Sequence, residues 1–358
     1  MEPDCTARLE DDRLLALRRR ATAAGVPLHV SLALTHRCNL RCLHCYVLPN
    51  AGASESELSA DDWLALAREA AAAGCFSMLL TGGEPLLRDD FAEIYLGIRR
   101  LGIYVSLFTN ATRVNRRVVE TLQAAPPTLI EVSLYGATPE TYGRVTGSAA
   151  ACAAAMRGIA LMRAAGLPVR LKTVLIKETA PEFAAIRALA APGEKPVRYD
   201  PAVHPRFAGD AEIEERHVPP AELAEMESRT VPELAAQWIK RQSEMQRQPE
   251  ADSPYLYACG AGLHSCYVSA DGMVQPCTST VRYGVRYRRG GLLAAFRKGR
   301  AALRAKRMPA DYECATCPDR LYCMICPAIA DLESGNEAGK FAYACRLAHE
   351  RSRKISGK

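Results

Sequence analysis

Six short apolar segments of β type alternate with helical segments in the first 200 residues of the chain. We expect strands over residues 28–35, 75–81, 103–109, 128–134, 169–176 and 197–202. Helical patterns separate them. Over residues 59–73, for example, Ser59 can cap the helix, and Asp61 and Asp62 favour its positive end. Because strands that alternate with helices form a parallel sheet, the sequence predicts an α/β fold, an incomplete α/β barrel.

The sequence changes character after residue 218. Residues 219–248 are charged and helical, whereas Gly, Pro and Cys become dense after residue 254. There we expect one hairpin over 265–277, turning at Asp271-Gly272, and a basic helical stretch over 292–307. So short and loop-rich a unit needs cross-links, and eight of the 14 cysteines lie in it. The predicted divisions are a helical lead-in over 1–26 (helix 11–24), a barrel over 27–218, a helical bridge over 219–253 and a cysteine-rich domain over 254–358.

Composition excludes two broad classes of protein. Hydrophobic residues make up 49% of the chain, too many for intrinsic disorder, and no apolar run approaches the roughly 18 residues of a membrane helix. The N-terminus is not a secretory signal, so we expect a soluble, cytoplasmic protein whose closely spaced thiols bind metal. The net charge of +6 comes largely from scattered arginine, so neither nucleic acid nor a membrane is an expected partner.

Three cysteines follow the first expected strand. Cys38, Cys42 and Cys45 have the spacing Cys-x3-Cys-x2-Cys. A short loop with this spacing can present three thiolates to three irons of a cubane cluster, and the fourth iron would keep an open coordination position. Open positions on metals are where substrates react. Structural zinc is the alternative, but it needs four ligands, and His44 lies between two of the cysteines with poor geometry for the fourth.

The triplet resembles the signature of the radical S-adenosylmethionine (SAM) superfamily, in which an aromatic or related residue precedes the last cysteine. Here that residue is His44, and Tyr46 follows the last cysteine. The resemblance implies a partial (β/α)6, TIM-like radical SAM barrel. It also implies a [4Fe–4S] cluster whose open iron is chelated by the amino and carboxylate groups of SAM. An electron from that cluster then cleaves SAM to methionine and a 5′-deoxyadenosyl radical.

A second motif follows the second expected strand. It is Gly82-Gly83-Glu84-Pro85, in which two glycines allow close approach of the backbone to a ligand and Glu84 offers a negative charge to an ammonium group. A simple turn is the alternative interpretation. The resemblance implies that this motif binds the SAM amino group.

Other candidate residues for binding SAM lie at or beyond strand ends. Asn110 and Ser133 suit ribose hydroxyls or the SAM carboxylate, and active sites of α/β barrels gather at the C-terminal ends of strands. The resemblance adds Arg144, directed toward the SAM carboxylate, and Ile176, packed on adenine. Each has a structural alternative as a turn, surface or core residue. Lys172, Asp200 and His204 could also face the cavity, but the sequence assigns no catalytic residue.

The eight C-terminal cysteines resemble the SPASM domain of peptide-modifying radical SAM enzymes, which holds two auxiliary [4Fe–4S] clusters. Their pattern is Cys259-x6-Cys266-x10-Cys277, then Cys314-x2-Cys317-x5-Cys323-x2-Cys326, then Cys345. By position, the first auxiliary cluster would take Cys259, Cys266, Cys277 and Cys326, and the second Cys314, Cys317, Cys323 and Cys345. The chain departs from the family in the spacer between Cys323 and Cys326, which has two residues where three are usual. Zinc ribbons are the alternative, because Cys-x2-Cys pairs suit zinc equally well.

The resemblance implies an enzyme with three [4Fe–4S] clusters that modifies a peptide or protein side chain. Our first hypothesis is maturation of a ribosomally made peptide (RiPP) by a cross-link, a thioether or dehydrogenation. A sulfatase-maturing enzyme stays open, although Thr278 stands where such enzymes usually carry an aspartate. Tetrapyrrole or haem side-chain modification and a non-catalytic iron–sulfur or zinc scaffold also stay open.

The expected partners follow from this hypothesis. They are a peptide or protein substrate and an electron donor such as flavodoxin or ferredoxin. Only about 27 residues precede the first expected strand, too few for an independent domain that binds a leader peptide. We therefore expect either a separate leader-recognition protein or direct capture of an extended peptide.

Overall fold

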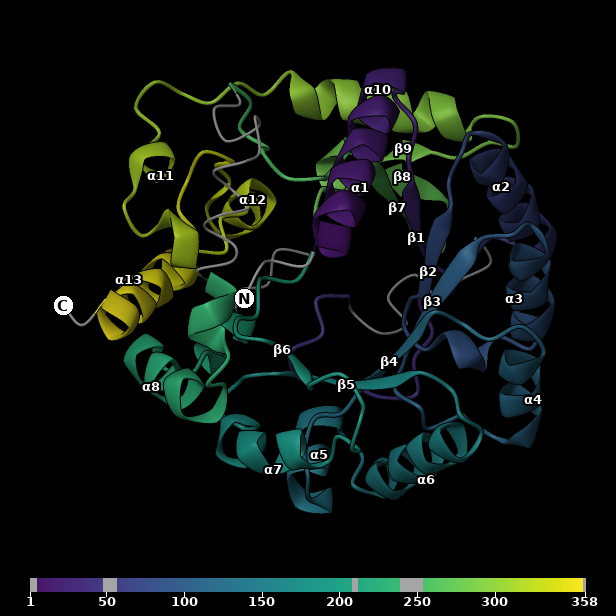
Figure 1. The fold of residues 1–358 in the computed structure, drawn as a ribbon, viewed down its shortest axis with the longest axis horizontal. Coiled ribbons are helices and arrows are strands. Elements are labelled where there is room, and N and C mark those ends of the chain that lie inside the picture. Colours follow the sequence, from purple (N-terminus) through teal and green to yellow (C-terminus); the bar gives the residue numbers. More distant parts are fainter. Residues whose placement is uncertain (1–4, 48–56, 208–211, 239–253, 357–358) are drawn as a thin grey trace.

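The computed structural model of this chain describes residues 5–47, 57–207, 212–238 and 254–356. Its centre is one curved sheet, which within these ranges has nine strands in the order β6-β5-β4-β3-β2-β1-β7-β8-β9 (Figure 1). The strands are β1 (His29–Ala33), β2 (Ser77–Thr81), β3 (Tyr104–Thr109), β4 (Leu129–Ser133), β5 (Val169–Val174), β6 (Arg198–Asp200), β7 (Ser265–Val268), β8 (Met273–Gln275) and β9 (Val285–Arg286).

Strands β1 to β6 are parallel and coincide with the six predicted segments. They curve round the middle of the molecule, and helices pack outside them (Figure 1). The helices are α2 (Ala60–Ala72), α3 (Phe91–Arg100), α4 (Arg116–Ala124), α5 (Pro139–Thr146), α6 (Ala150–Ala164) and α7 (Phe183–Ala188). Ser59 caps α2 as predicted, accepting a hydrogen bond from the Asp62 amide. The predicted α/β fold class is therefore confirmed.

The main hydrophobic core lies between the sheet and the helices. Alternate strand residues such as Val30, Met78 and Val105 point outward into it and are at most 1% exposed. The residues between them point inward, so each strand presents one side chain in two to the interior of the curve. No single helix in the described ranges is long and apolar enough to span a membrane. Helices α5 and α6 pass that test only as a pair, bent by 107°.

The remaining α-helices of the described residues precede β1 or follow β6. They are α1 (Cys5–Ala24), α8 (Pro220–Thr230), α10 (Leu292–Arg304), α11 (Glu313–Thr316), α12 (Pro327–Ser334) and α13 (Ala342–Ser356). Short 3-10 turns occur at Pro85–Leu87, Ala180–Glu182, Glu212–Arg216, Val281–Tyr283 and Arg320–Tyr322. Helix α8 begins the predicted bridge, and residues 239–248 of that prediction lie outside the described residues.

The predicted hairpin forms, and it also joins the sheet of the barrel, which the sequence did not indicate. Its first strand, β7, pairs parallel with β1, and its second strand, β8, pairs antiparallel with β7 and β9. The cysteine-rich region therefore extends the sheet of the barrel instead of standing apart from it. The predicted division at residue 254 remains a boundary in composition, while the sheet crosses it.

Candidate functional site

A cavity of about 390 Å³ opens inside the curve of the sheet, at the C-terminal ends of the parallel strands. Many of the predicted site residues line it: Cys38, Cys42, His44, Cys45, Tyr46, Gly82, Gly83, Asn110 and Ser133. Met324, Ile329 and Phe341 of the cysteine-rich region also line it. Both parts of the chain thus contribute to one cavity.

The loop that carries the cysteine triplet is held against α5. The amides of Arg41 and Leu43 donate to the carbonyls of Thr146 and Val145, each at 2.9 Å. Burial raises the pKa of the Cys45 thiol to about 11. Burial, and then the neighbouring Cys45 and Cys38, raise the pKa of Cys42 further. Three mutually close, half-buried thiols would ionise readily only beside a positively charged group, and iron in a cluster supplies that charge.

The triplet brings three thiol donors to the cavity. In the described part of the chain, no three His, Cys, Asp or Glu side chains converge as a single metal ion would require. The three thiols of the triplet line the same cavity. This arrangement suits the three occupied corners of a cubane.

Gly82 and Gly83 let two loops meet. A Cβ atom on Gly83 would lie 2.3 Å from the carbonyl oxygen of Arg37, and one on Gly82, at φ +134°, would lie 2.5 Å from that of Thr35. The Gly83 amide donates to the Thr35 carbonyl at 2.8 Å. Glycine is required here because the loop after β2 lies directly against the backbone that precedes the triplet.

Glu84 does not face the cavity. Its side chain is fully buried and accepts hydrogen bonds from Thr109 Oγ1 at 2.7 Å, the Asn110 amide at 2.7 Å and the Leu86 amide at 3.1 Å. Burial raises its pKa to about 7. The structure gives this carboxylate three protein donors, and its binding of a ligand ammonium group stays a prediction. Glu84 ties the loop after β2 to the end of β3, and Pro85 is buried beside it.

Two further predicted residues, Arg144 and Ile176, are not among those that line the cavity. The Arg144 guanidinium donates to Thr141 Oγ1 at 2.7 Å and is not among the side chains that line the cavity. Ile176 is completely buried in a small cluster with Val174 and Val203. Val174 and Val203 line the cavity, whereas Ile176 does not. The reason is that the chain turns after β5, so Val174 is the last residue of that strand with an inward side chain.

Aromatic side chains form part of the wall. The His44 ring packs edge-on against Tyr135, with 4.3 Å between ring centroids, and Tyr46 lies 5.0 Å from His204. Burial, followed by the charge of Lys172, lowers the pKa of His44 to about 4, so this ring is neutral at physiological pH. The sequence did not indicate Tyr135 as a site residue. The alternation of a strand could have indicated it, because residues two apart, such as Ser133 and Tyr135, point to the same face.

An ion pair lies on the wall formed by β5 and β6. Lys172 Nζ is 3.0 Å from Asp200 Oδ2, and both residues line the cavity together with His204. Lys172 also lies 5.4 Å from the centroid of the Phe108 ring. The structure thus brings together three side chains that the sequence offered only as possible neighbours.

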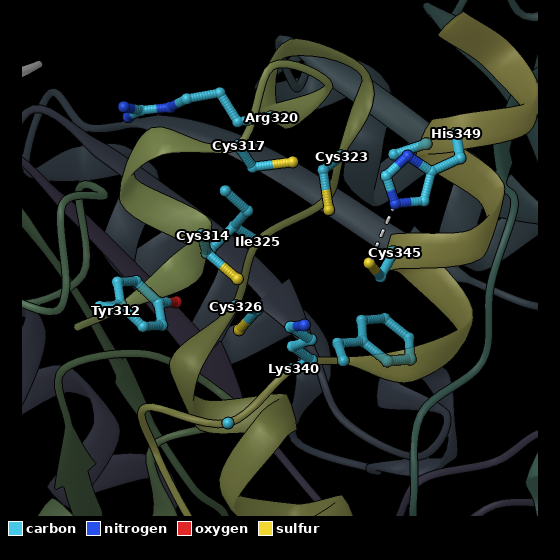
Figure 2. A pocket seen from close by; sticks show the side chains of 13 residues that line it. Tyr312, Cys314, Cys317, Arg320, Cys323, Ile325, Cys326, Lys340, Cys345 and His349 are labelled. Atoms are coloured by element: carbon cyan, nitrogen blue, oxygen red, sulfur yellow. Dashed lines mark hydrogen bonds between the residues drawn. The ribbon is translucent and has the colours of Figure 1, made fainter. Parts of the chain in front are cut away.

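A second, smaller pocket lies among the C-terminal cysteines (Figure 2). Cys314, Cys317, Cys323, Cys326 and Cys345 line it, and Cys345 Sγ is 3.6 Å from His349 Nε2. The pKa of Cys323 is raised to about 12, mainly by burial and also by its neighbours Cys345, Cys314 and Cys317. Phe341 lines both this pocket and the main cavity, so the two adjoin.

The remaining C-terminal cysteines divide unequally. The pKa of Cys326 is raised to about 11, mainly by burial and also by Cys277 and Cys259. These three thiols are therefore near one another. Cys266 is instead buried in the main core and is not brought together with them. The structure thus brings three of the four expected cysteines together, and the ligand set itself stays a prediction.

Residues 32–190 match the family model described as the Radical SAM superfamily. PqqA peptide cyclase of Xanthomonas oryzae is 32% identical over 169 residues, which are 47% of this chain and 45% of that protein. The AdoMet-dependent heme synthase of Methanosarcina barkeri is 32% identical over 166 residues, 46% of this chain and 48% of that protein. The chain thus spans about half the length of the curated relatives it matches.

Solved structures resemble the chain over almost its full length. Native anSMEcpe with bound AdoMet has a TM-score of 0.70 at 16% identity and covers 92% of this chain and 98% of its own. Streptococcus suis SuiB bound to precursor peptide SuiA has a TM-score of 0.68 at 17% identity, covering 96% and 82%. The shared fold includes the cysteine-rich region as well as the sheet. The chain is therefore similar to the Radical SAM superfamily in the sequence of residues 32–190, and it shares its fold with these solved structures.

Proposed function

We propose that this protein cleaves SAM reductively and uses the resulting 5′-deoxyadenosyl radical to modify a side chain of a peptide, in the maturation of a RiPP precursor. The observation that carries the proposal is the composition of the cavity wall. The cysteine triplet lines the cavity, and so do Met324, Ile329 and Phe341 of the cysteine-rich region. A substrate in this cavity would lie between the site of SAM cleavage and the auxiliary thiols.

The triplet and its neighbours supply the SAM site in this proposal. Cys38, Cys42 and Cys45 would hold a [4Fe–4S] cluster, which supplies the electron for SAM cleavage when bound. Gly82, Gly83, Asn110 and Ser133 would contribute to the SAM site, because they line the cavity. Glu84 would act indirectly, by accepting a hydrogen bond from the backbone amide of Asn110 and so fixing the position of that residue.

The other wall suits a side chain of mixed character. Phe108, Tyr46 and Tyr135 offer apolar surface, and the Lys172–Asp200 pair offers one cation and one anion. Such a wall can orient a peptide through a few polar contacts within a mainly apolar site. It also supports a peptide or protein as substrate, as does the resemblance to PqqA peptide cyclase.

The C-terminal cysteines would hold two auxiliary clusters that take up the surplus electron or bind the substrate. Cys314, Cys317, Cys323 and Cys345 would form one set around the pocket that they line. Cys326 also lines this pocket, but Cys277 and Cys259 are the cysteines that raise its pKa, so it would belong to the other set. The proposal includes an electron donor such as flavodoxin or ferredoxin. It also includes a separate leader-recognition protein or direct peptide capture, and the cytoplasmic location stays a prediction.

The test is anaerobic reconstitution of the full chain with iron and sulfide, followed by a SAM-cleavage assay with and without a candidate precursor peptide. We expect about 12 irons and 12 sulfides per chain, because three cubanes hold four of each. We also expect 5′-deoxyadenosine and a change in peptide mass. A chain that saturates with zinc and about four irons would refute the auxiliary clusters.

A tetrapyrrole substrate is the second candidate, because the AdoMet-dependent heme synthase matches at the same identity as the peptide cyclase. The same reconstituted protein distinguishes the two. Conversion of a porphyrin side chain, with no change in any peptide, would favour this second function.

A further inference from the structure

The pairing of β7 with β1 decides which way Cys266 points. The two strands are parallel, with Cys266 opposite Val30 and Val268 opposite Leu32. Val30 and Leu32 point outward into the main core, and neighbouring strands in register present paired residues on the same face. Cys266 therefore points outward, away from the cavity.

The surroundings of Cys266 agree with this direction. It is 3% exposed and belongs to the core that also contains Phe296 and Leu292 of α10. Burial raises its pKa, and the only other group that contributes is Cys75, another thiol of the same core. A neutral thiol in such a place acts as a small hydrophobic side chain.

The other three cysteines meet in a different part of the fold. Cys277 and Cys326 pack against a separate hydrophobic cluster that includes Tyr257 and Tyr283. The loop after Cys259 is held beside Cys277, because the Gly262 amide donates to the Pro276 carbonyl at 3.1 Å. Cys259 contributes to the raised pKa of both Cys277 and Cys326.

Tyr267 shows that the sheet separates Cys266 from this set. It follows Cys266 in β7 and so points to the opposite face. The pKa of Tyr267 is raised mainly by burial, and Tyr46 and Cys277 also contribute. Tyr46 lines the cavity. To bring Cys266 to that side, β7 would have to slip by one residue, which would turn all of its side chains over and expel Val268 from the core.

We infer that the first auxiliary cluster is bound by three cysteines, Cys259, Cys277 and Cys326, and that its fourth iron carries an exchangeable ligand instead of Cys266. Cys259 is exposed, so a small ligand from solution can reach this site. The inference rests on the proposed function, because it presupposes auxiliary clusters. It gives the chain a second iron with an open position, remote from the triplet in sequence.

The first experiment counts iron in full-length, reconstituted variants. Cys266→Val keeps a side chain of similar volume and cannot bind iron, and Cys75→Val is its matched control in the same core. We expect both variants to retain the parent's iron content, whereas Cys277→Ala loses about four irons. Loss of about four irons from Cys266→Val but not from Cys75→Val, with circular dichroism unchanged in both, would overturn the inference. Cys266→Ala repeats the measurement if the valine does not fit.

The second experiment detects the open position directly. A cubane with three thiolates releases its fourth iron on mild oxidation: [4Fe–4S]²⁺ gives a paramagnetic [3Fe–4S]⁺ cluster, one Fe²⁺ and one electron, which ferricyanide accepts. The measurement uses a Cys38→Ala, Cys42→Ala, Cys45→Ala variant, so that the triplet cluster does not contribute. We expect about one [3Fe–4S]⁺ cluster per chain by electron paramagnetic resonance, and the same amount after adding Cys266→Val.

The two ways of failing are distinguishable. A parent protein that binds only about four irons contradicts the proposed auxiliary clusters themselves. A triplet variant that binds about eight irons and yields no [3Fe–4S]⁺ signal overturns the three-cysteine inference and leaves the proposed function intact.

Discussion

Lys172 and Asp200 form an ion pair across two adjacent strands, with 3.0 Å between Nζ and Oδ2, on the wall of the cavity. Lys172 lies in β5 and Asp200 ends β6, so their backbones are fixed by the parallel pairing of these strands. Their side chains are 18% and 36% exposed, so the pair is only partly screened by water. Two opposite charges in this position can orient a substrate or transfer a proton.

We predict that Lys172→Met and Asp200→Asn each reduce product formation by roughly 100-fold, the scale of a lost acid, base or orienting charge. Iron content and uncoupled 5′-deoxyadenosine formation should remain, because the triplet loop is untouched. Lys177→Met is the control, since Lys177 is exposed and donates to the Glu215 carbonyl away from the cavity. Full turnover by Lys172→Met, measured by peptide mass, would contradict a role for the pair.

Replacement of Cys38, Cys42 and Cys45 by alanine should abolish formation of 5′-deoxyadenosine and leave about eight irons bound. The reason is that only this cluster contacts SAM in the proposed site. Chromatography of the reaction mixture and iron analysis provide the two measurements. SAM cleavage at the parent rate in this variant would refute the assignment of the triplet.

Replacement of Cys323 by serine should separate SAM cleavage from modification of the peptide. The triplet loop is unchanged, so 5′-deoxyadenosine still forms, whereas product is lost with the second auxiliary cluster. Because metal binding contributes to the folding of so loop-rich a region, circular dichroism must accompany the assay. Cys152→Ala, in the buried face of α6, is the control and should retain both activities. A folded Cys323→Ser protein that makes full product would show that this cluster is dispensable.

Glu84 should make stability depend on pH. Burial raises its pKa from 4.5 to about 7, so the folded state binds this proton more tightly than the unfolded state. The resulting stability is fully present below about pH 4.5 and is lost as the pH rises to about 7, a change of about 3 kcal/mol at most. Urea unfolding of Glu84→Gln should show a smaller fall in the free energy of unfolding over this range. An identical pH dependence in both proteins would contradict an elevated pKa.

Local patterns were enough to predict the strands and the position of the site. The six apolar segments become β1 to β6 because each is bounded by turn residues and matched to a helix of sufficient length. Asn110 and Ser133 were predicted to lie near the triplet because parallel strands end at one edge, and all of them line the cavity. Cavity residues from the C-terminal region, such as Phe341, could not be predicted, because nothing in their local sequence distinguishes them from core residues.

The sequence by itself determined the α/β class, the order of the strands along the chain and the spacing of the cysteines, since all three depend on neighbouring residues. Tertiary structure alone decided what those residues face. Glu84 belongs to the expected motif, yet its carboxylate is directed to the end of β3 by donors from Thr109 and Asn110. Cys266 has a suitable spacing, yet its partner Val30 places it in the core. Alternation along a strand defines two faces, but only pairing with a distant strand decides which of them meets the core and which meets the cavity.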